Sequence, residues 1–273
     1  MPIATPLVLA GCGKMGGALL DGWLLKGVPA RDIIVVEPSA AIAESLEGRG
    51  LGGVHSRAEA IAPEVAPTVV VFAVKPQTMN AVVPGYRRFV GGGTAFLSIA
   101  AGTPIRYFED TLGRDAAILR AMPNTPAAVH RGITVISANA RVTAAQRALC
   151  GELLGAVGAV EWIEDEALMD AVTAVSGSGP AYVFLLVECL AKAGAEAGLP
   201  GDLATRLARA TVAGSGELLA RASEPASTLR ANVTSPGGTT AAALEVLMAA
   251  DGLQPLLTKA VAAATRRSRE LAG

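Results

Sequence analysis

An apolar run that enters a glycine-rich turn near the start of the chain constrains the fold more than any other feature. Residues 7–16 read Leu-Val-Leu-Ala-Gly-Cys-Gly-Lys-Met-Gly, and the apolar spacing of a helix follows directly. Gly11 allows the tight turn, Gly13 lets the backbone approach a phosphate, and Gly16 lets the helix pack against the strand. Unpaired N–H groups and the helix dipole then attract negative charge. The turn predicts a dinucleotide site formed by Gly11, Gly13, Lys14, Met15 and Gly16.

The pattern along the chain predicts two domains. Strands are expected at 6–10, 33–36, 68–74, 95–99, 118–122, 133–136 and 159–163. Helices are expected at 14–26, 40–49, 77–90 (with a break near Pro84), 105–112 and 143–154. This alternation is typical of a doubly wound, mostly parallel sheet. We therefore expect an α/β dinucleotide-binding Rossmann domain over 1–164 and an all-α domain over 165–273, where the sequence becomes helical and rich in Ala and Leu.

Composition argues against several functions. The net charge of −1 gives no reason to expect a nucleic acid or an anionic membrane as partner. The three cysteines lie far apart in the sequence, which indicates reduced thiols in a cytoplasmic protein. No metal site is expected. No uninterrupted apolar run reaches about 18 residues, so no membrane span is expected. The apolar excess of the helical half favours a subunit interface, with a well-filled core as the alternative.

Further cofactor contacts are expected where strands end, because ligands of doubly wound sheets bind at the carboxyl edge. The candidates are Ala73, Val74, Lys75 and Pro76, then Ala100 and Gly102, then Met122, Pro123 and Asn124. Small residues at positions 100 and 102 would let a flat nicotinamide ring approach the backbone. The Lys75 ammonium could neutralise cofactor charge or form a salt bridge at the sheet edge.

The choice between NADH and NADPH depends on the turn Glu37-Pro38-Ser39. An acid about 20 residues after the glycine turn commonly binds the ribose 2′-hydroxyl, which favours NADH. The Ser39 hydroxyl could instead bind a 2′-phosphate, but no arginine is close in sequence. We expect both cofactors to work and NADH to be unusually competitive.

Two segments of the helical half combine hydroxyls with a predicted helix start. They are 176–182, which contains Ser178, and 232–240. Unpaired N–H groups at a helix N-terminus suit a small carboxylate, although an ordinary N-cap would look the same. Because two such segments occur in one domain, we favour a substrate site.

The motifs together resemble one enzyme family over nearly the whole chain. They are Gly-Cys-Gly-Lys-Met-Gly (11–16), Ala-Val-Lys-Pro (73–76), Arg-Ala-Met-Pro-Asn-Thr-Pro (120–126), Ser-Gly-Ser-Gly-Pro-Ala-Tyr (176–182) and Val-Thr-Ser-Pro-Gly-Gly-Thr-Thr (233–240). This combination closely resembles pyrroline-5-carboxylate reductase, and the last string is the most specific. The resemblance implies NAD(P)H-dependent reduction of 1-pyrroline-5-carboxylate to L-proline. It also implies a homodimer formed through the helical domain, and in many members of the family five dimers form a decamer.

The resemblance also implies a substrate pocket between the nucleotide domain and the helices of the dimer. Matching positions in this chain are Ser235, Gly237, Gly238, Thr239 and Thr240. Thr240 matches the family threonine thought to hydrogen-bond the imine nitrogen, and is therefore the candidate catalytic residue. A protonated imine accepts hydride without a strong acid, which agrees with the presence of only two histidines.

Two alternatives remain open at this point. One is a dehydrogenase of the 3-hydroxyacid type, which carries a catalytic lysine in a glycine-rich helix start after the domain junction. Here the next lysine after that segment is Lys192, several turns further along. The other is a non-enzymatic NAD(P)H-sensing protein, which would need the glycine turn but not the segment 235–240.

Overall fold

The computed structural model describes residues 4–272 as two compact units. The N-terminal unit contains the described residues up to Gly177 together with the end of the last helix from Thr265 onward, and the helical unit is Ser178–Ala264. The predicted boundary after Glu164 follows the last strand, where the alternation of strands and helices ends. The division by internal contacts lies later, after Gly177, because the first helical turns beyond the sheet pack on the N-terminal unit.

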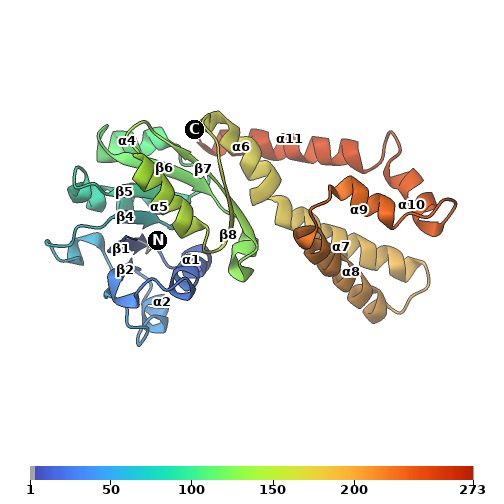
Figure 1. Ribbon diagram of the computed structural model, residues 1–273, viewed down its shortest axis with the longest axis horizontal. Coiled ribbons are helices and arrows are strands. Elements are labelled where there is room, and N and C mark those ends of the chain that lie inside the picture. The colour runs from blue at the N-terminus through green and yellow to red at the C-terminus, as the bar shows by residue number, and fades with distance from the viewer. Residues whose placement is uncertain (1–3, 273) are drawn as a thin grey trace. The chain divides into compact units, whose positions relative to one another are not determined.

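One mostly parallel sheet forms the centre of the N-terminal unit (Figure 1). Its strands are β1 (Leu7–Ala10), β2 (Ile33–Val36), β3 (Gly53–His55), β4 (Val69–Phe72), β5 (Ala95–Ser98), β6 (Ala117–Met122), β7 (Gly132–Ala138) and β8 (Gly158–Trp162). The order across the sheet is β3-β2-β1-β4-β5-β6-β7-β8, and only the β6–β7 pair among these is antiparallel. The chain order reverses direction between β1 and β4, which is where doubly wound sheets bind ligands.

Helices cover both faces of this sheet. They are α1 (Lys14–Leu25), α2 (Ala40–Ser45), α3 (Met79–Val82), α4 (Ile105–Leu112), α5 (Ala144–Leu154) and α6 (Met169–Val172). Leu7 and Leu9 of β1 pack with α1 and α5, whereas Val8 and Ala10 face α3 and α4. Strand residues alternate between the two faces, and both faces of β1 are buried, so its sequence is an unbroken apolar run. The Trp23 indole N–H donates to the Leu153 carbonyl at 2.9 Å and ties α1 to α5.

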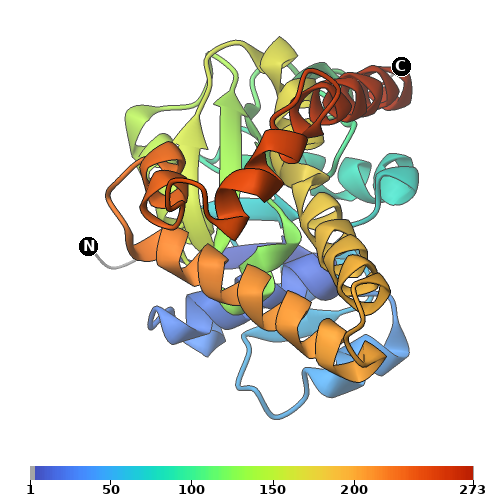
Figure 2. The same cartoon turned by 90° about the vertical axis from the view of Figure 1, so that its right-hand side faces the viewer.

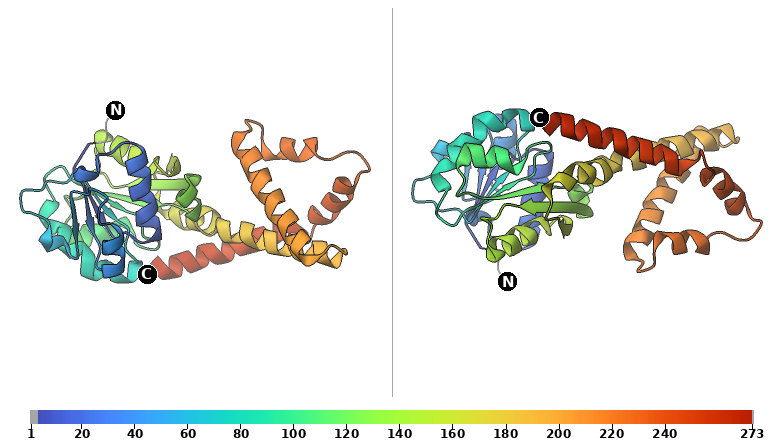
Figure 3. Two further views of the ribbon diagram at one scale, coloured as in Figure 1. Left: turned by 90° about the horizontal axis from the view of Figure 1, so that it is seen from below. Right: turned by 90° about the horizontal axis from the view of Figure 1, so that it is seen from above.

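The helical unit consists of helices with wide exposed apolar surfaces. Its helices are α7 (Gly179–Glu196), α8 (Gly201–Arg221), α9 (Ala226–Asn232), α10 (Thr239–Leu247) and the first part of α11 (Leu253–Ala272). The long helices α7 and α8 contact each other and diverge from the short turn that joins them (Figure 2). Helices α8, α9 and α10 lie apart rather than around one centre (Figure 3). Phe184 of α7 is 62% exposed and Val246 of α10 is 71% exposed, so the apolar excess of this half does not fill a core within the chain.

The structure departs from the expected elements at three places. The edge strand β3 was not expected, because among its three residues only Val54 is apolar, and pairing with β2 forms it. The helix expected over 77–90 is α3 followed by a 3₁₀ helix, Val83–Phe89, since Pro84 lacks the N–H that an α-helix needs. The helix start expected in the segment 176–182 is preceded by a π-helix, Thr173–Gly177, that leads into α7.

Candidate functional site

The glycine turn has the backbone geometry that its sequence predicts. Gly11 has φ +88°, a conformation that side-chain-bearing residues rarely adopt, and its N–H donates to the Val36 carbonyl at 2.8 Å. A Cβ on Gly16 would lie 2.3 Å from the Gly11 carbonyl oxygen and 3.2 Å from Ala73 Cβ. The turn after β1 and the start of α1 therefore pack backbone against backbone, and only glycine fits at position 16.

The N-terminus of α1 fits the phosphates of a dinucleotide. Gly13 is the N-cap residue and supplies no side-chain cap, and the first turn contains no acidic residue. A Cβ on Gly13 would meet nothing within 4 Å, so no protein group occupies the space in front of it. Lys14 is exposed and Met15 half-buried beside this opening. The N–H groups of the first helical turn have no partner within an α-helix, and a bound phosphate would satisfy them.

Glu37 is a structural part of the same turn. One carboxylate oxygen accepts the Cys12 N–H at 2.7 Å, and the other accepts the Ser39 N–H at 2.9 Å. Glu37 is 7% exposed, and Pro38 beside it is exposed. Burial, and to a lesser extent this carboxylate, raises the pKa of the Cys12 thiol to about 11. The thiol is therefore protonated at neutral pH and adds no negative charge next to the phosphate turn.

The other predicted cofactor residues lie at the same edge of the sheet. Residues 73–76 follow β4 and residues 100–102 follow β5. Met122 ends β6 and residues 123–124 follow it, and these three strands run parallel to β1. Lys75 is exposed and has no carboxylate within 4 Å among the described residues, so the structural salt bridge considered from sequence is not formed. Ala100 is buried and Gly102 has φ +73°.

Two members of this edge also support neighbouring segments. The Asn124 side-chain oxygen accepts the Ile133 N–H at 3.0 Å and so holds the start of β7. Met122 lies against the π-helix, because a Cβ on Gly177 would be 2.5 Å from the Met122 Cε. The contact joins the end of β6 to the segment that leads into α7.

The predicted substrate segment surrounds the N-terminus of α10. Gly238 is the N-cap residue and supplies no side-chain cap, so Thr239 and Thr240 form the first turn. Gly237 has φ +68°, and the Gly238 N–H donates to the Ser235 carbonyl at 3.0 Å, which bends the chain into the helix. Ser235 and Thr239 are exposed and Thr240 is half-buried. The bend presents hydroxyls and helix-terminal N–H groups together, as a carboxylate site requires.

Ser178 lies in a different setting from the one expected. It has φ −86° and ψ −22°, so the chain stays helical through it from the π-helix into α7. Pro180 explains the widened turn, since its ring lacks an N–H and would clash with the carbonyl four residues before it in a regular α-helix. Short π-helices are common at functional sites. The segment is therefore a distorted helix rather than a loop followed by a free helix end.

A cavity of about 230 Å³ extends the dinucleotide edge beyond β2. Its lining includes the end of β2 and the turn after it, residues after β3 and the segment that follows β4: Val36, Pro38, Ser56, Arg57, Ala58, Glu59, Val74, Thr78, Ala81, Val82 and Tyr86. Arg57 and Ser56 were not predicted, because the strand that brings them here has almost no apolar pattern. Because β3 runs parallel to β2, the residues that follow it lie at the same edge of the sheet as the other predicted cofactor residues.

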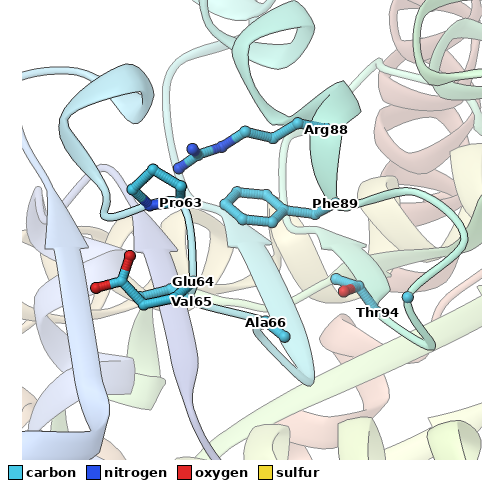
Figure 4. Close-up of a pocket in the computed structure, with 8 residues that line it drawn as sticks. Pro63, Glu64, Val65, Ala66, Arg88, Phe89 and Thr94 are labelled. Atoms are coloured by element: carbon cyan, nitrogen blue, oxygen red, sulfur yellow. The ribbon is translucent and has the colours of Figure 1, made fainter.

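A second hollow lies elsewhere and carries none of the predicted residues (Figure 4). Its lining includes residues 63–66, which precede β4, and Thr94, which precedes β5. It is thus at the amino ends of these strands, away from the ligand edge. Arg88 there donates to the Ile61 carbonyl at 2.7 Å and lies over the Phe89 ring at 4.5 Å. Among residues 4–272, no group of three or more His, Cys, Asp and Glu side chains has the arrangement of a metal site.

Comparison with known proteins relates each half of the chain to a protein family and the full chain to reductases of one name. The family described as pyrroline-5-carboxylate reductase dimerisation matches residues 166–271, and the family described as NADP oxidoreductase, coenzyme F420-dependent, matches residues 7–102. The pyrroline-5-carboxylate reductase of Pseudomonas aeruginosa is 42% identical, with 99% of this chain and 98% of the relative covered. That of Arabidopsis thaliana is 38% identical, with 96% and 93% covered.

Solved structures agree with this assignment. A pyrroline-5-carboxylate reductase from Coxiella burnetii has a TM-score of 0.91 at 33% identity, covering 98% of this chain and 99% of that one. The pyrroline carboxylate reductase of Plasmodium falciparum, solved with NADP bound, has a TM-score of 0.82 at 29% identity and full coverage of both chains. By its sequence over the full length and by its fold, this chain is a member of the pyrroline-5-carboxylate reductase family.

Proposed function

We propose that the protein reduces 1-pyrroline-5-carboxylate to L-proline with NADPH or NADH. The observation that carries the proposal is full-length identity of 42% to a reductase of this name, together with a glycine turn whose backbone geometry suits a phosphate. The test is a spectrophotometric assay of cofactor oxidation with 1-pyrroline-5-carboxylate and each reduced cofactor. Oxidation that depends on the imine supports the proposal, and its absence with intact dinucleotide binding would favour an NAD(P)H-sensing protein.

The dinucleotide would be held at the carboxyl edge of the sheet. Gly11, Gly13, Lys14, Met15 and Gly16 would bind the pyrophosphate through backbone N–H groups at the start of α1. Residues 37–39 and 73–76 would flank it, and the Lys75 ammonium would offset phosphate charge. Residues 100–102 and 122–124 would bound the nicotinamide end. When bound, the reduced nicotinamide supplies a hydride to the imine carbon.

The substrate would be held by the bend at the start of α10. Ser235, Gly237, Gly238, Thr239 and Thr240 would bind the carboxylate and the ring through hydroxyls and N–H groups, and Ser178 would contribute from the start of α7. A cyclic imine is readily protonated, so the site needs orientation more than acid catalysis. Holding the imine carbon near the hydride donor supplies most of the rate gain through proximity.

Thr240→Ala is expected to lower kcat/KM by roughly tenfold or more, which corresponds to about 1.5–3 kcal/mol for a hydrogen bond near the reacting centre. Thr240→Ser keeps the hydroxyl and should retain most of the activity. Steady-state kinetics with varied 1-pyrroline-5-carboxylate measures both variants. An Ala variant as active as wild type would remove Thr240 from the mechanism.

We further propose a cytoplasmic homodimer formed through the helical unit. The helical stretch 166–196 is, by length and composition alone, apolar enough to cross a membrane. We propose that a second subunit covers it rather than lipid, since the family match for dimerisation spans 166–271 and the exposed apolar side chains continue onto α10 and α11. Assembly of five dimers into a decamer is a further proposal. Analytical ultracentrifugation without detergent tests both: a decamer supports both, a dimer supports the homodimer and contradicts the decamer, and a monomer, or a protein that aggregates without detergent, contradicts both.

A further inference from the structure

The cavity beyond β2 has the composition of a purine site. Val36, Val74 and Val82 supply apolar walls that suit the faces of a flat ring. Tyr86, also in the lining, is fully buried, and its hydroxyl has no hydrogen-bond partner. The Tyr86 ring therefore contributes to the wall of the cavity, while its hydroxyl lies behind that wall.

The cavity also continues from the position that reads the adenosine ribose in doubly wound folds. Its lining includes Pro38, which follows directly on Glu37, the acid at the end of β2. In NAD-selective sites such an acid binds the ribose hydroxyls, whereas an arginine nearby accommodates a 2′-phosphate. Here both Glu37 carboxylate oxygens already accept backbone N–H groups from the chain. Glu37 therefore stabilises the turn, and because a carboxylate repels a phosphate, a group that binds a 2′-phosphate must come from elsewhere.

Arg57 is the positively charged residue that lines this cavity. It follows β3, which pairs with β2 in the register Val36↔His55, and so it lies beside the end of β2 despite its distance in sequence. Among the described residues no carboxylate lies within 4 Å of the Arg57 guanidinium, and its side chain is exposed. Ser56, exposed beside it, adds a hydroxyl.

The acidic groups near this cavity do not cancel that charge. Glu59 lines it, but the Glu59 Oε1 lies against Gly85, 2.9 Å from the position that a Cβ there would occupy. This carboxylate, after burial, also contributes to raising the pKa of Tyr86. It therefore lies on the Tyr86 side of the cavity. Glu37, buried and bonded to two N–H groups, does not line it.

Resting on the proposed function, we propose that Arg57, assisted by Ser56, binds the 2′-phosphate of NADPH and makes NADPH the preferred cofactor. A guanidinium binds a phosphate through two parallel N–H···O bonds, and a 2′-hydroxyl offers no comparable partner. Arg57 therefore stabilises bound NADPH and contributes little to bound NADH. The NADH preference suggested by Glu37 is then outweighed by a residue that the sequence does not place near the ribose.

The test measures binding rather than turnover. Isothermal titration of the full-length protein with NADPH, NADH, 2′,5′-ADP and 5′-ADP gives dissociation constants for wild type, Arg57→Ala and Arg57→Lys. Arg57→Ala should weaken NADPH and 2′,5′-ADP roughly tenfold or more and leave NADH and 5′-ADP within about twofold. Arg57→Lys should fall between, because an ammonium keeps the charge but not the paired bonds.

Arg87→Ala is the matched control. Arg87 is exposed on the 3₁₀ helix that contains Tyr86 but does not line the cavity, so the same loss of charge there should leave all four ligands unaffected. Equal weakening of NADPH and NADH by Arg57→Ala, or no weakening, would overturn the assignment of Arg57. A wild-type protein that binds none of the four ligands would instead overturn the proposed function, so the two failures are distinguishable.

Discussion

Gly16→Ala should raise the dissociation constant for NADPH by about a hundredfold or more, equivalent to about 2.7 kcal/mol. The added Cβ would lie 2.3 Å from the Gly11 carbonyl oxygen, a backbone atom that cannot rotate away. Either the turn or the start of α1 must move, and the N–H groups that face the phosphates move with it. Overpacking of this kind also lowers the free energy of unfolding by about 1–3 kcal/mol. Fluorescence titration and urea denaturation measure the two effects.

Neighbouring glycines provide controls on the same turn. A Cβ on Gly17 would meet only the Cys12 carbonyl oxygen, at 3.8 Å. Gly17→Ala should therefore preserve NADPH binding and add roughly 0.5–1 kcal/mol of stability from helix propensity. A Cβ on Gly13 would meet no protein atom within 4 Å, so the Gly13→Ala variant should fold normally. It should bind NADPH more weakly because the new methyl group occupies the space of the bound phosphates. Wild-type affinity in Gly16→Ala would refute the proposed phosphate site.

Glu166→Ala is expected to lower the free energy of unfolding by about 3 kcal/mol, near the low end for a broken buried ion pair. Glu166 Oε1 lies 2.8 Å from the Arg120 guanidinium and 2.9 Å from the Ile105 amide nitrogen at the start of α4. The Arg120 side chain is 6% exposed and that of Glu166 29%, so the variant leaves a buried cation without its partner. Urea unfolding at a fixed protein concentration measures the loss, since dimer stability depends on concentration.

The double variant Arg120→Met/Glu166→Gln separates the buried charge from simple loss of packing. Arg120 is paired across the sheet with Ser98 and Ser137, both buried, and neither can balance a positive charge. Removing both charges should restore most of the stability that Glu166→Ala loses. If Glu166→Ala unfolds at the wild-type urea concentration, the ion pair does not stabilise the junction between β6 and the first helical turn after β8.

Features encoded by local spacing could be predicted from the sequence. The glycine turn, the strands on either side of the switch point and the helix α4 are found where the pattern placed them. Their signals are short in sequence and physically direct: a conformation open only to glycine, an apolar run buried on two faces, and a strong helical periodicity. The same holds for the bend that begins α10, where Gly237 and Gly238 predict a turn followed by a helix.

Features that depend on partners distant in sequence could not be predicted. The Glu37 side chain was placed near the ribose, but its bonds to the Cys12 and Ser39 N–H groups exist only once the turn has folded. Arg57 follows a strand that forms through pairing rather than through its own pattern. The ion pair between Arg120 and Glu166 joins two residues that are separated in the chain by β7 and β8. The continuity of helix around Pro180 likewise needed the π-helix, for which sequence spacing gives no signal.

The most direct test of the account follows a labelled hydride. Reduced cofactor that carries deuterium at the transferable C4 position is incubated with the protein and 1-pyrroline-5-carboxylate, and the proline formed is analysed by mass spectrometry. The account predicts L-proline with a single deuterium on the former imine carbon. Proline without deuterium there, or oxidation of the cofactor without any proline, would contradict it.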